Sequence, residues 1–290
     1  MKKILCIVLL FIIASCGRKR IESENKIITV SIAPFKYFVE AIARDEYIVN
    51  VMVPAGSNPH IYEPYPEQIS KLKRSIAYIS NGFLGFEMTW LDRFYEMNRK
   101  MKKLSLGEAI DPIKSEHQHD GENVEGVDPH YWVSPQCAYK IASSVKVFLT
   151  GLNPDNRNLY EIGYQELTGK IKTADDSAKQ LAFYGNGRGF MIYHPNLGYL
   201  ARDYGLEEIP VEYEGKEPSP SRMKYLIDRA KSDNLKVIMV QKEYDTRNAR
   251  AIASETGARV VVIDPLAEDW YSSEFEIINI LKESFELQMN

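Results

Sequence analysis

Four side chains have the types and positions expected of a metal-binding site. They are His60, His130, His194 and Asp264, and each adjoins a proline near the predicted end of a strand or loop. Imidazole nitrogen and carboxylate oxygen are ligands that Zn²⁺ takes in four-coordinate sites. A lone histidine is more often a structural hydrogen-bonding group, but here three of the five histidines in the chain share one setting. The pattern therefore indicates a candidate site of three neutral imidazoles and one carboxylate, with a net charge of about +1 around a divalent ion.

The loop that ends at His60 shows how the fold could position such a ligand. A strand is predicted over residues 47–53, and a turn rich in proline and glycine follows it. A helix is predicted to begin near Pro66, because proline is well tolerated in a first helical turn. His60 would then lie beyond the carboxyl end of a buried strand, where open α/β sheets bind their ligands.

Strands and helices alternate along the chain, which favours β-α units on parallel sheets. Further strands are predicted over residues 26–32, 76–80, 189–193, 208–212, 237–240 and 260–263. Helices are predicted over residues 34–44, 66–74, 85–99, 134–151, 197–204, 219–232, 246–256 and 275–287.

Two stretches depart from this alternation. Residues 154–182 have a continuous helical pattern, and a helix of ~28 residues would span ~42 Å. Residues 115–127 are polar, acidic and glycine-containing, so they are predicted to form an exposed loop. His117 and His119 in that loop are expected to be solvated and not to be fixed ligands.

The predicted fold is two α/β lobes joined by one long linker helix, with the metal site in the cleft between the lobes. The expected boundaries are residues 27–152 for the N-terminal lobe, 153–182 for the linker helix and 183–290 for the C-terminal lobe. Each lobe supplies two of the four candidate ligands, and clefts between domains commonly hold small ligands.

The N-terminus has the features of an exported lipoprotein. Residues 1–15 are predicted to be a signal peptide, with early lysines and an apolar stretch too short for a comfortable membrane span. This stretch ends in Ile-Ala-Ser-Cys, which resembles the bacterial lipobox, so Cys16 is the expected lipidation site and residues 16–26 a polar tether. A plain signal peptide with a chance cysteine is the alternative. We expect a protein anchored to a membrane by lipid, in the periplasm or on the outer cell surface.

Composition and cysteine content narrow the class further. The 290-residue chain is 44% hydrophobic and 26% charged, as is ordinary for a globular domain, and its net charge of −4 gives no argument for a nucleic-acid partner. Cys6 lies in the signal peptide and Cys16 is expected to carry lipid, which leaves Cys137 alone in the mature domain. We therefore expect a buried thiol at Cys137, no intramolecular disulfide, no cysteine-based zinc site and a monomeric protein.

Five motifs together resemble one known family. They are PAGSNPHIYEP at residues 54–64, DPHYWVSP at 128–135, HPNLGYLARDYGL at 194–206, GKEPSP at 215–220 and VIDPL at 262–266. The chain resembles the solute-binding proteins of zinc/manganese ABC transporters over nearly its whole mature length. The resemblance implies two lobes joined by one rigid helix, metal ligation by the four candidate ligands, and partnership with a membrane permease and its cytoplasmic ATPase.

The third ligand position bears on which metal is bound. Manganese members of this family tend to carry glutamate there, so the resemblance favours Zn²⁺ for His194, with Mn²⁺ as the alternative. Two features depart from the family pattern. The polar loop at residues 115–127 contains only two histidines, and Pro195-Asn196 follows the third ligand in place of an acidic and a small residue.

The predicted function is capture of Zn²⁺ outside the cytoplasm and its delivery to an ABC permease for import. A metal-dependent surface adhesin and a zinc hydrolase are the rival functions. A hydrolase would need an open coordination position and a general base, and the chain has no H-E-x-x-H motif. Metal affinity should fall as pH drops through ~6.5, because protons compete for the imidazoles. Glu63, Asp128 and Glu243 are candidates to accept hydrogen bonds from the ligand rings.

Overall fold

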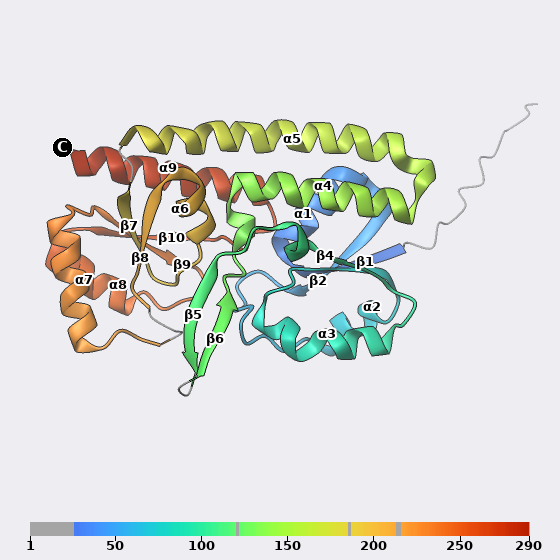
Figure 1. Cartoon of the computed structure of the whole chain (residues 1–290), viewed down its shortest axis with the longest axis horizontal. Helices are drawn as coiled ribbons and strands as arrows, with labels where there is room; N and C mark the ends of the chain where they lie inside the picture. The colour runs from blue at the N-terminus through green and yellow to red at the C-terminus, as the bar shows by residue number, and fades with distance from the viewer. Residues whose placement is uncertain (1–25, 120–121, 185–186, 213–215, 290) are drawn as a thin grey trace, which may run out of the picture.

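The structure is a computed structural model that describes residues 26–119, 122–184, 187–212 and 216–289 (Figure 1). The predicted signal peptide, the lipidation site Cys16 and all but the last residue of the tether lie outside the described residues. Across the described ranges, no helix combines the length and the apolar character needed to cross a membrane.

The first half of the chain forms a four-stranded parallel sheet in the order β2-β1-β3-β4. Helices cover both faces of this sheet, so its inner strands are buried almost throughout. The strands are β1 (Lys26–Ile32), β2 (Tyr47–Val53), β3 (Ser75–Ser80) and β4 (Lys102–Ser105). The helices are α1 (Ala33–Ala43), α2 (Pro66–Leu72), α3 (Gly85–Met97) and α4 (Pro135–Leu152).

The second half repeats this architecture with a parallel sheet in the order β10-β9-β7-β8. Its helices end as the sequence indicates: Gly205 and Gly257 adopt positive φ angles of 69° and 73° just after α6 and α8. The strands are β7 (Arg188–Ile192), β8 (Leu206–Pro210), β9 (Val237–Gln241) and β10 (Arg259–Ile263). The helices are α6 (Gly198–Tyr204), α7 (Pro220–Ser232) and α8 (Arg247–Thr256).

Each sheet has a point at which the strand order reverses. β1 lies between β2 and β3, and β7 lies between β8 and β9, so successive connections leave each sheet in opposite directions. In open α/β sheets, the crevice outside the carboxyl ends of the strands at such a point is where ligands bind. This topology places the loops after β2, β7 and β9 where they can contribute to one site.

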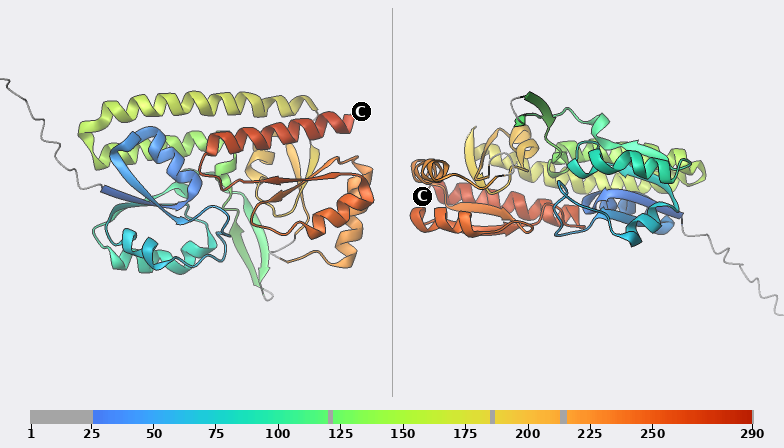
Figure 2. Two further views of the ribbon diagram at one scale, coloured as in Figure 1. Left: turned by 180° about the vertical axis from the view of Figure 1, so that it is seen from behind. Right: turned by 90° about the horizontal axis from the view of Figure 1, so that it is seen from below.

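Two long helices lie on the same side of the molecule: the first runs along both lobes and the second along the C-terminal lobe, as Figures 1 and 2 show. They are α5 (Arg157–Lys179) and α9 (Trp270–Met289), which pack against each other. The continuous helix predicted over residues 154–182 is wrong at its ends, because short 3₁₀ turns at Pro154–Asn156 and Gln180–Tyr184 flank α5. The helix of 23 residues is roughly 35 Å long. α9 begins five residues before the predicted start at residue 275.

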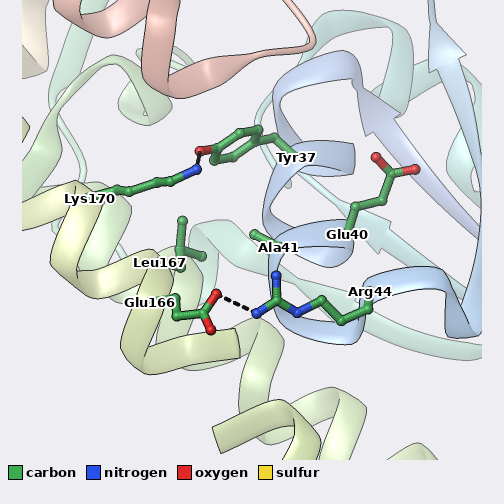
Figure 3. A pocket seen from close by; sticks show the side chains of 7 residues that line it. All are labelled: Tyr37, Glu40, Ala41, Arg44, Glu166, Leu167 and Lys170. Atoms are coloured by element: carbon green, nitrogen blue, oxygen red, sulfur yellow. Dashed lines mark hydrogen bonds and ion pairs between the residues drawn. The ribbon is translucent and has the colours of Figure 1, made fainter. Parts of the chain in front are cut away.

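Side-chain pairs join α5 to α1 of the N-terminal lobe. The Nζ atom of Lys170 donates to the hydroxyl of Tyr37 over 3.2 Å, and Arg44 forms an ion pair with Glu166 (Figure 3). The backbones also approach closely, because a Cβ atom on Gly163 would lie 2.6 Å from the carbonyl oxygen of Ile42. The contact between α1 and α5 is therefore tight as well as charged.

The exposed loop predicted over residues 115–127 is instead largely a β-hairpin. β5 (Lys114–His119) and β6 (Glu122–Val127) pair antiparallel, and the hairpin projects from the body of the molecule in Figure 1. An antiparallel ladder satisfies the backbone whatever the side-chain polarity, so a polar sequence does not prevent it.

Apolar packing is continuous from one half of the molecule to the other. One core cluster includes Ile28 and Phe38 from the first half together with Phe190 and Leu281 from the second. A smaller cluster, which includes Ile238, packs between the second sheet and the helices α7 and α8. The fold is thus two parallel-sheet α/β domains, as predicted. We propose the lobe boundaries at residues 27–152 and 183–290, because each range contains one parallel sheet, apart from Lys26 at the start of β1.

Candidate metal centre

Three imidazole rings converge between the two sheets. The Nε2 atom of His60 lies 3.2 Å from Nε2 of His130 and 3.2 Å from Nε2 of His194. Within the described ranges, these three side chains form the group of possible ligands whose atoms all lie within 4.8 Å of one another. A tetrahedral Zn²⁺ with Zn–N bonds of ~2.0–2.1 Å requires nitrogens about 3.3 Å apart. The two distances from His60 therefore fit two edges of a zinc tetrahedron.

The loop after β2 presents His60. The backbone N–H of His60 donates to Oδ1 of Asn58 over 2.8 Å, which closes a local turn. The start of α3 packs closely against the backbone of His60, since a Cβ atom on Gly85 would lie 2.8 Å from the carbonyl oxygen of His60. Glu63, three residues further along the loop, is exposed.

Asp128 holds the ring of His130. Its Oδ1 atom lies 2.7 Å from Nδ1 of His130 and accepts the backbone N–H of the same residue over 2.9 Å. This contact fixes the tautomer that leaves Nε2 free to bind a metal. Burial lowers the pKa of His130, while Asp128 acts in the opposite direction. The lowered pKa keeps the ring neutral, which is the form that ligates.

His194 follows β7 and is held by groups that lie far along the chain. Its Nδ1 atom lies 3.2 Å from Oε1 of the buried Glu212. Gln241, at the end of β9, donates from its amide to the carbonyl oxygen of His194 over 2.6 Å. The ring of Tyr244 stacks on the imidazole with centroids 4.9 Å apart and an interplanar angle of 14°. Glu212 was not predicted from the sequence, although it follows closely the carboxyl end of β8, where parallel sheets place their ligand-binding groups.

Two carboxylates adjoin the cluster without joining it. Asp264 and Glu243 each have a buried oxygen, Oδ1 and Oε2 respectively, with no hydrogen-bond partner. Oδ2 of Asp264 lies 3.3 Å from Nζ of Lys242. Burial raises the pKa of Glu243, Asp264 raises it further, and His130 acts in the opposite direction. The structure thus brings the three predicted histidines together, and the carboxylate of Asp264 lies outside the group within 4.8 Å.

Two parallel-sheet lobes, spanned by long helices and with convergent ligands between them, define a two-lobed solute-binding protein. The chain belongs to the ZnuA family, the zinc-uptake complex component A, periplasmic, whose family model matches residues 28–276.

Named relatives agree with this family. The high-affinity zinc uptake system protein ZnuA of Bacillus subtilis (strain 168) is 26% identical over 275 residues, covering 88% of this chain and 85% of that protein. The zinc-binding lipoprotein AdcA of Streptococcus pneumoniae (strain ATCC BAA-255 / R6) is 24% identical over 269 residues, covering 89% of this chain. The chain spans about half the length of that streptococcal relative, 53%.

Solved structures share the fold over almost the whole chain. A crystal structure of a ZnuA superposes with a TM-score of 0.83 at 36% identity, covering 90% of this chain and all of that one. A manganese-bound periplasmic metal-binding protein of Candidatus Liberibacter asiaticus has a TM-score of 0.74 at 24% identity, covering 88% of this chain and 99% of that one, and shows the fold alone. Membership of this family makes the protein a solute-binding transport protein and not an enzyme, which excludes a zinc hydrolase.

Proposed function

We propose that this protein captures Zn²⁺ outside the cytoplasm and delivers it to an ABC permease, driven by the cognate ATPase, for import. The observation that carries the proposal is the set of three Nε2 atoms, with His60 3.2 Å from each of its two neighbours. Neutral imidazoles suit Zn²⁺ better than Mn²⁺, which favours oxygen ligands. Mn²⁺ remains the alternative cargo.

Asp264 is the proposed fourth ligand. Its Oδ1 atom is buried without a hydrogen-bond partner, and a carboxylate oxygen in that condition is stabilised by a nearby cation. The turn after β10 would have to move to bring this carboxylate to the metal, because it lies outside the three-histidine group. A four-ligand shell suits a carrier, since it leaves no position for a reactive water.

A lipid anchor on Cys16 is proposed to hold the mature chain at the membrane. The proposal is supported by the Ile-Ala-Ser-Cys sequence and by the name of the relative AdcA, a lipoprotein. Substitution of Cys16 by alanine should release the protein from the membrane fraction, and mass spectrometry of the wild-type N-terminal peptide should find the lipid. A water-soluble, unmodified wild-type protein would contradict the anchor.

We propose a monomer without a nucleic-acid partner.

Calorimetric titration of metal-stripped protein with Zn²⁺ and Mn²⁺ tests the function. We expect binding of Zn²⁺ near one-to-one, with weaker Mn²⁺ binding and a loss of orders of magnitude in His194→Ala. Equal or tighter binding of Mn²⁺ would make the protein a manganese carrier. A deletion strain with normal zinc uptake but impaired attachment would instead favour the adhesin. Failure to bind either metal would refute the site.

A further inference from the structure

A buried carboxyl group fixes the loop that carries His194. Oε1 of Glu208, on β8, accepts the backbone N–H groups of Asn196 and Leu197 over 3.0 and 2.7 Å. The carboxyl group is enclosed, although the residue as a whole is only half-buried. Asn196 and Leu197 are the last two residues before α6. Glu208 therefore determines where the loop from His194 ends and where α6 begins.

The first two residues of α6 lie against Asp128 of the other lobe. A Cβ atom on Gly198 would lie 2.9 Å from Oδ2 of Asp128 and 3.5 Å from Oε2 of Glu208, so the two carboxyl groups flank this glycine. The hydroxyl of Tyr199 donates to the carbonyl oxygen of Asp128 over 2.8 Å and accepts the N–H of Ile113 over 3.1 Å. The segment that Glu208 holds therefore touches both the side chain and the backbone of Asp128.

Asp128 in turn orients His130 through its Oδ1 atom, 2.7 Å from Nδ1. A continuous path of contacts thus runs from the loop of His194, through Glu208 and Gly198, to Asp128 and the ring of His130. Burial raises the pKa of Glu208 to about 8, and Asp128 raises it as well, against the two backbone hydrogen bonds. At pH 7 the carboxyl group is mostly protonated, so it can flank the Asp128 carboxylate without a second negative charge.

We propose that Glu208 is a positioning residue that couples His194 in one lobe to His130 in the other. It holds the His194 loop and, through the start of α6, the carboxylate that orients His130. Two ligands from different lobes are thereby placed together, before the metal arrives. This inference rests on the proposed metal-binding function and adds a residue that touches no metal.

Zinc affinity at pH 7, measured by competition with a chromophoric chelator, tests the coupling. Glu208→Ala should weaken binding about tenfold or more, the range typical of groups that hold a metal ligand. Glu208→Gln should recover affinity to within about threefold, because its carbonyl oxygen still accepts both N–H groups and it is uncharged like the protonated acid. Glu207→Ala is the matched control, since this neighbouring side chain pairs with Arg229 on the surface, and it should leave affinity unchanged.

A double-mutant cycle shows whether Glu208 acts through Asp128. The losses from Glu208→Ala and Asp128→Asn should be clearly less than additive if both lie on one path. Wild-type affinity in Glu208→Ala, failure of the glutamine variant to recover binding, or additive losses would overturn the coupling. If the alanine variant does not fold, Gly198→Ala perturbs the same contact, and unchanged affinity there would also overturn it. Because His194→Ala tests the metal site itself, a wild-type protein that binds no zinc would refute the function separately.

Discussion

At the scale of single residues, the site depends on groups that hold two of the three rings by Nδ1 and so present Nε2 of these rings to the metal. Asp128 does this for His130, and Glu212 does it for His194. A carboxylate in this role also stabilises the ring N–H, which becomes more acidic when the other nitrogen binds a cation.

Glu212→Gln should weaken zinc binding about tenfold, because the amide oxygen still accepts the Nδ1–H but carries no negative charge. The measurement is a competition titration against a chelator at pH 7. Glu217→Gln is the control, since that carboxylate is exposed and lies 3.9 Å from Arg247. Unchanged affinity in Glu212→Gln would mean that ring orientation alone, without charge, suffices at His194.

Replacing each carboxylate by the uncharged amide of the same shape tests whether Asp264 or Glu243 is the metal ligand. We expect Asp264→Asn to weaken zinc binding by tenfold to a hundredfold and Glu243→Gln by less than about threefold, because only a direct ligand loses a bond to the metal. Calorimetric titration of both variants beside the wild type provides the comparison. A larger loss in Glu243→Gln would assign the fourth position to Glu243, whose Oε2 is equally buried and unpartnered.

The three histidines could be predicted because each follows a recognisable strand or loop end and the chain has few others. The groups that support them were harder to find. Glu212 comes just after a short strand and Gln241 is the last residue of one, positions where polar residues are common and usually solvated. Tyr244 has no local sequence signal at all. Only the packing of β7, β8 and β9 side by side shows that these three residues surround one ring.

At the scale of elements, the bounds of a strand could be predicted from the sequence wherever an apolar run ended at a turn. β2 and β7 are such runs, and both match the predicted strands to within one residue. β4 was not predicted, because its four residues include two lysines and are at most half-buried. The sequence of the β5–β6 hairpin does not alternate between apolar and polar residues, so the pairing of these two strands could not be predicted.

Glu274 on α9 is predicted to make stability depend on pH. Burial raises the pKa of Glu274 well above its usual value, and its Oε1 has no hydrogen-bond partner. The folded protein thus keeps a proton that the unfolded chain loses above its pKa of ~4.3. The contribution of Glu274 to the free energy of unfolding is fully present below that pH, and it is lost as the pH rises toward the raised pKa. Glu274→Gln should therefore increase the melting temperature more at pH 8 than at pH 5, by a few degrees per kcal/mol.

Thermal unfolding at both pH values measures this effect. Glu276→Gln, two residues further along the same helix, is the matched control, because that side chain is exposed. An equal change in melting temperature at pH 5 and pH 8 would show that Glu274 is ionised in the folded protein or does not titrate in this range.

At the scale of the whole molecule, α5 and α9 link the two lobes into one structure. α5 packs on α1 in the first lobe, while α9 packs on α5 and reaches Phe38 through Trp270, with ring centroids 5.2 Å apart. The lobes also exchange two indole hydrogen bonds, from Trp132 to the carbonyl oxygen of Pro265 and from Trp270 to that of Trp132. A continuous core of this kind predicts a single cooperative unfolding transition.

Alanine substitutions at two glycines of α5 test whether this helix takes part in the single unfolding transition. A methyl group on Gly163 would lie within 2.6–2.8 Å of backbone atoms of Ala41 and Ile42, whereas one on Gly169 would meet nothing within 4 Å. Gly163→Ala should destabilise the protein by about 1–3 kcal/mol, because backbone cannot move aside as a flexible side chain can. Gly169→Ala should stabilise it by about 0.5–1 kcal/mol, since alanine is the better helix former. Denaturant unfolding should show one transition in both variants, shifted in opposite directions. A separate early transition in Gly163→Ala would instead mean that the first lobe unfolds on its own, and that α5 links the lobes without making them one cooperative unit.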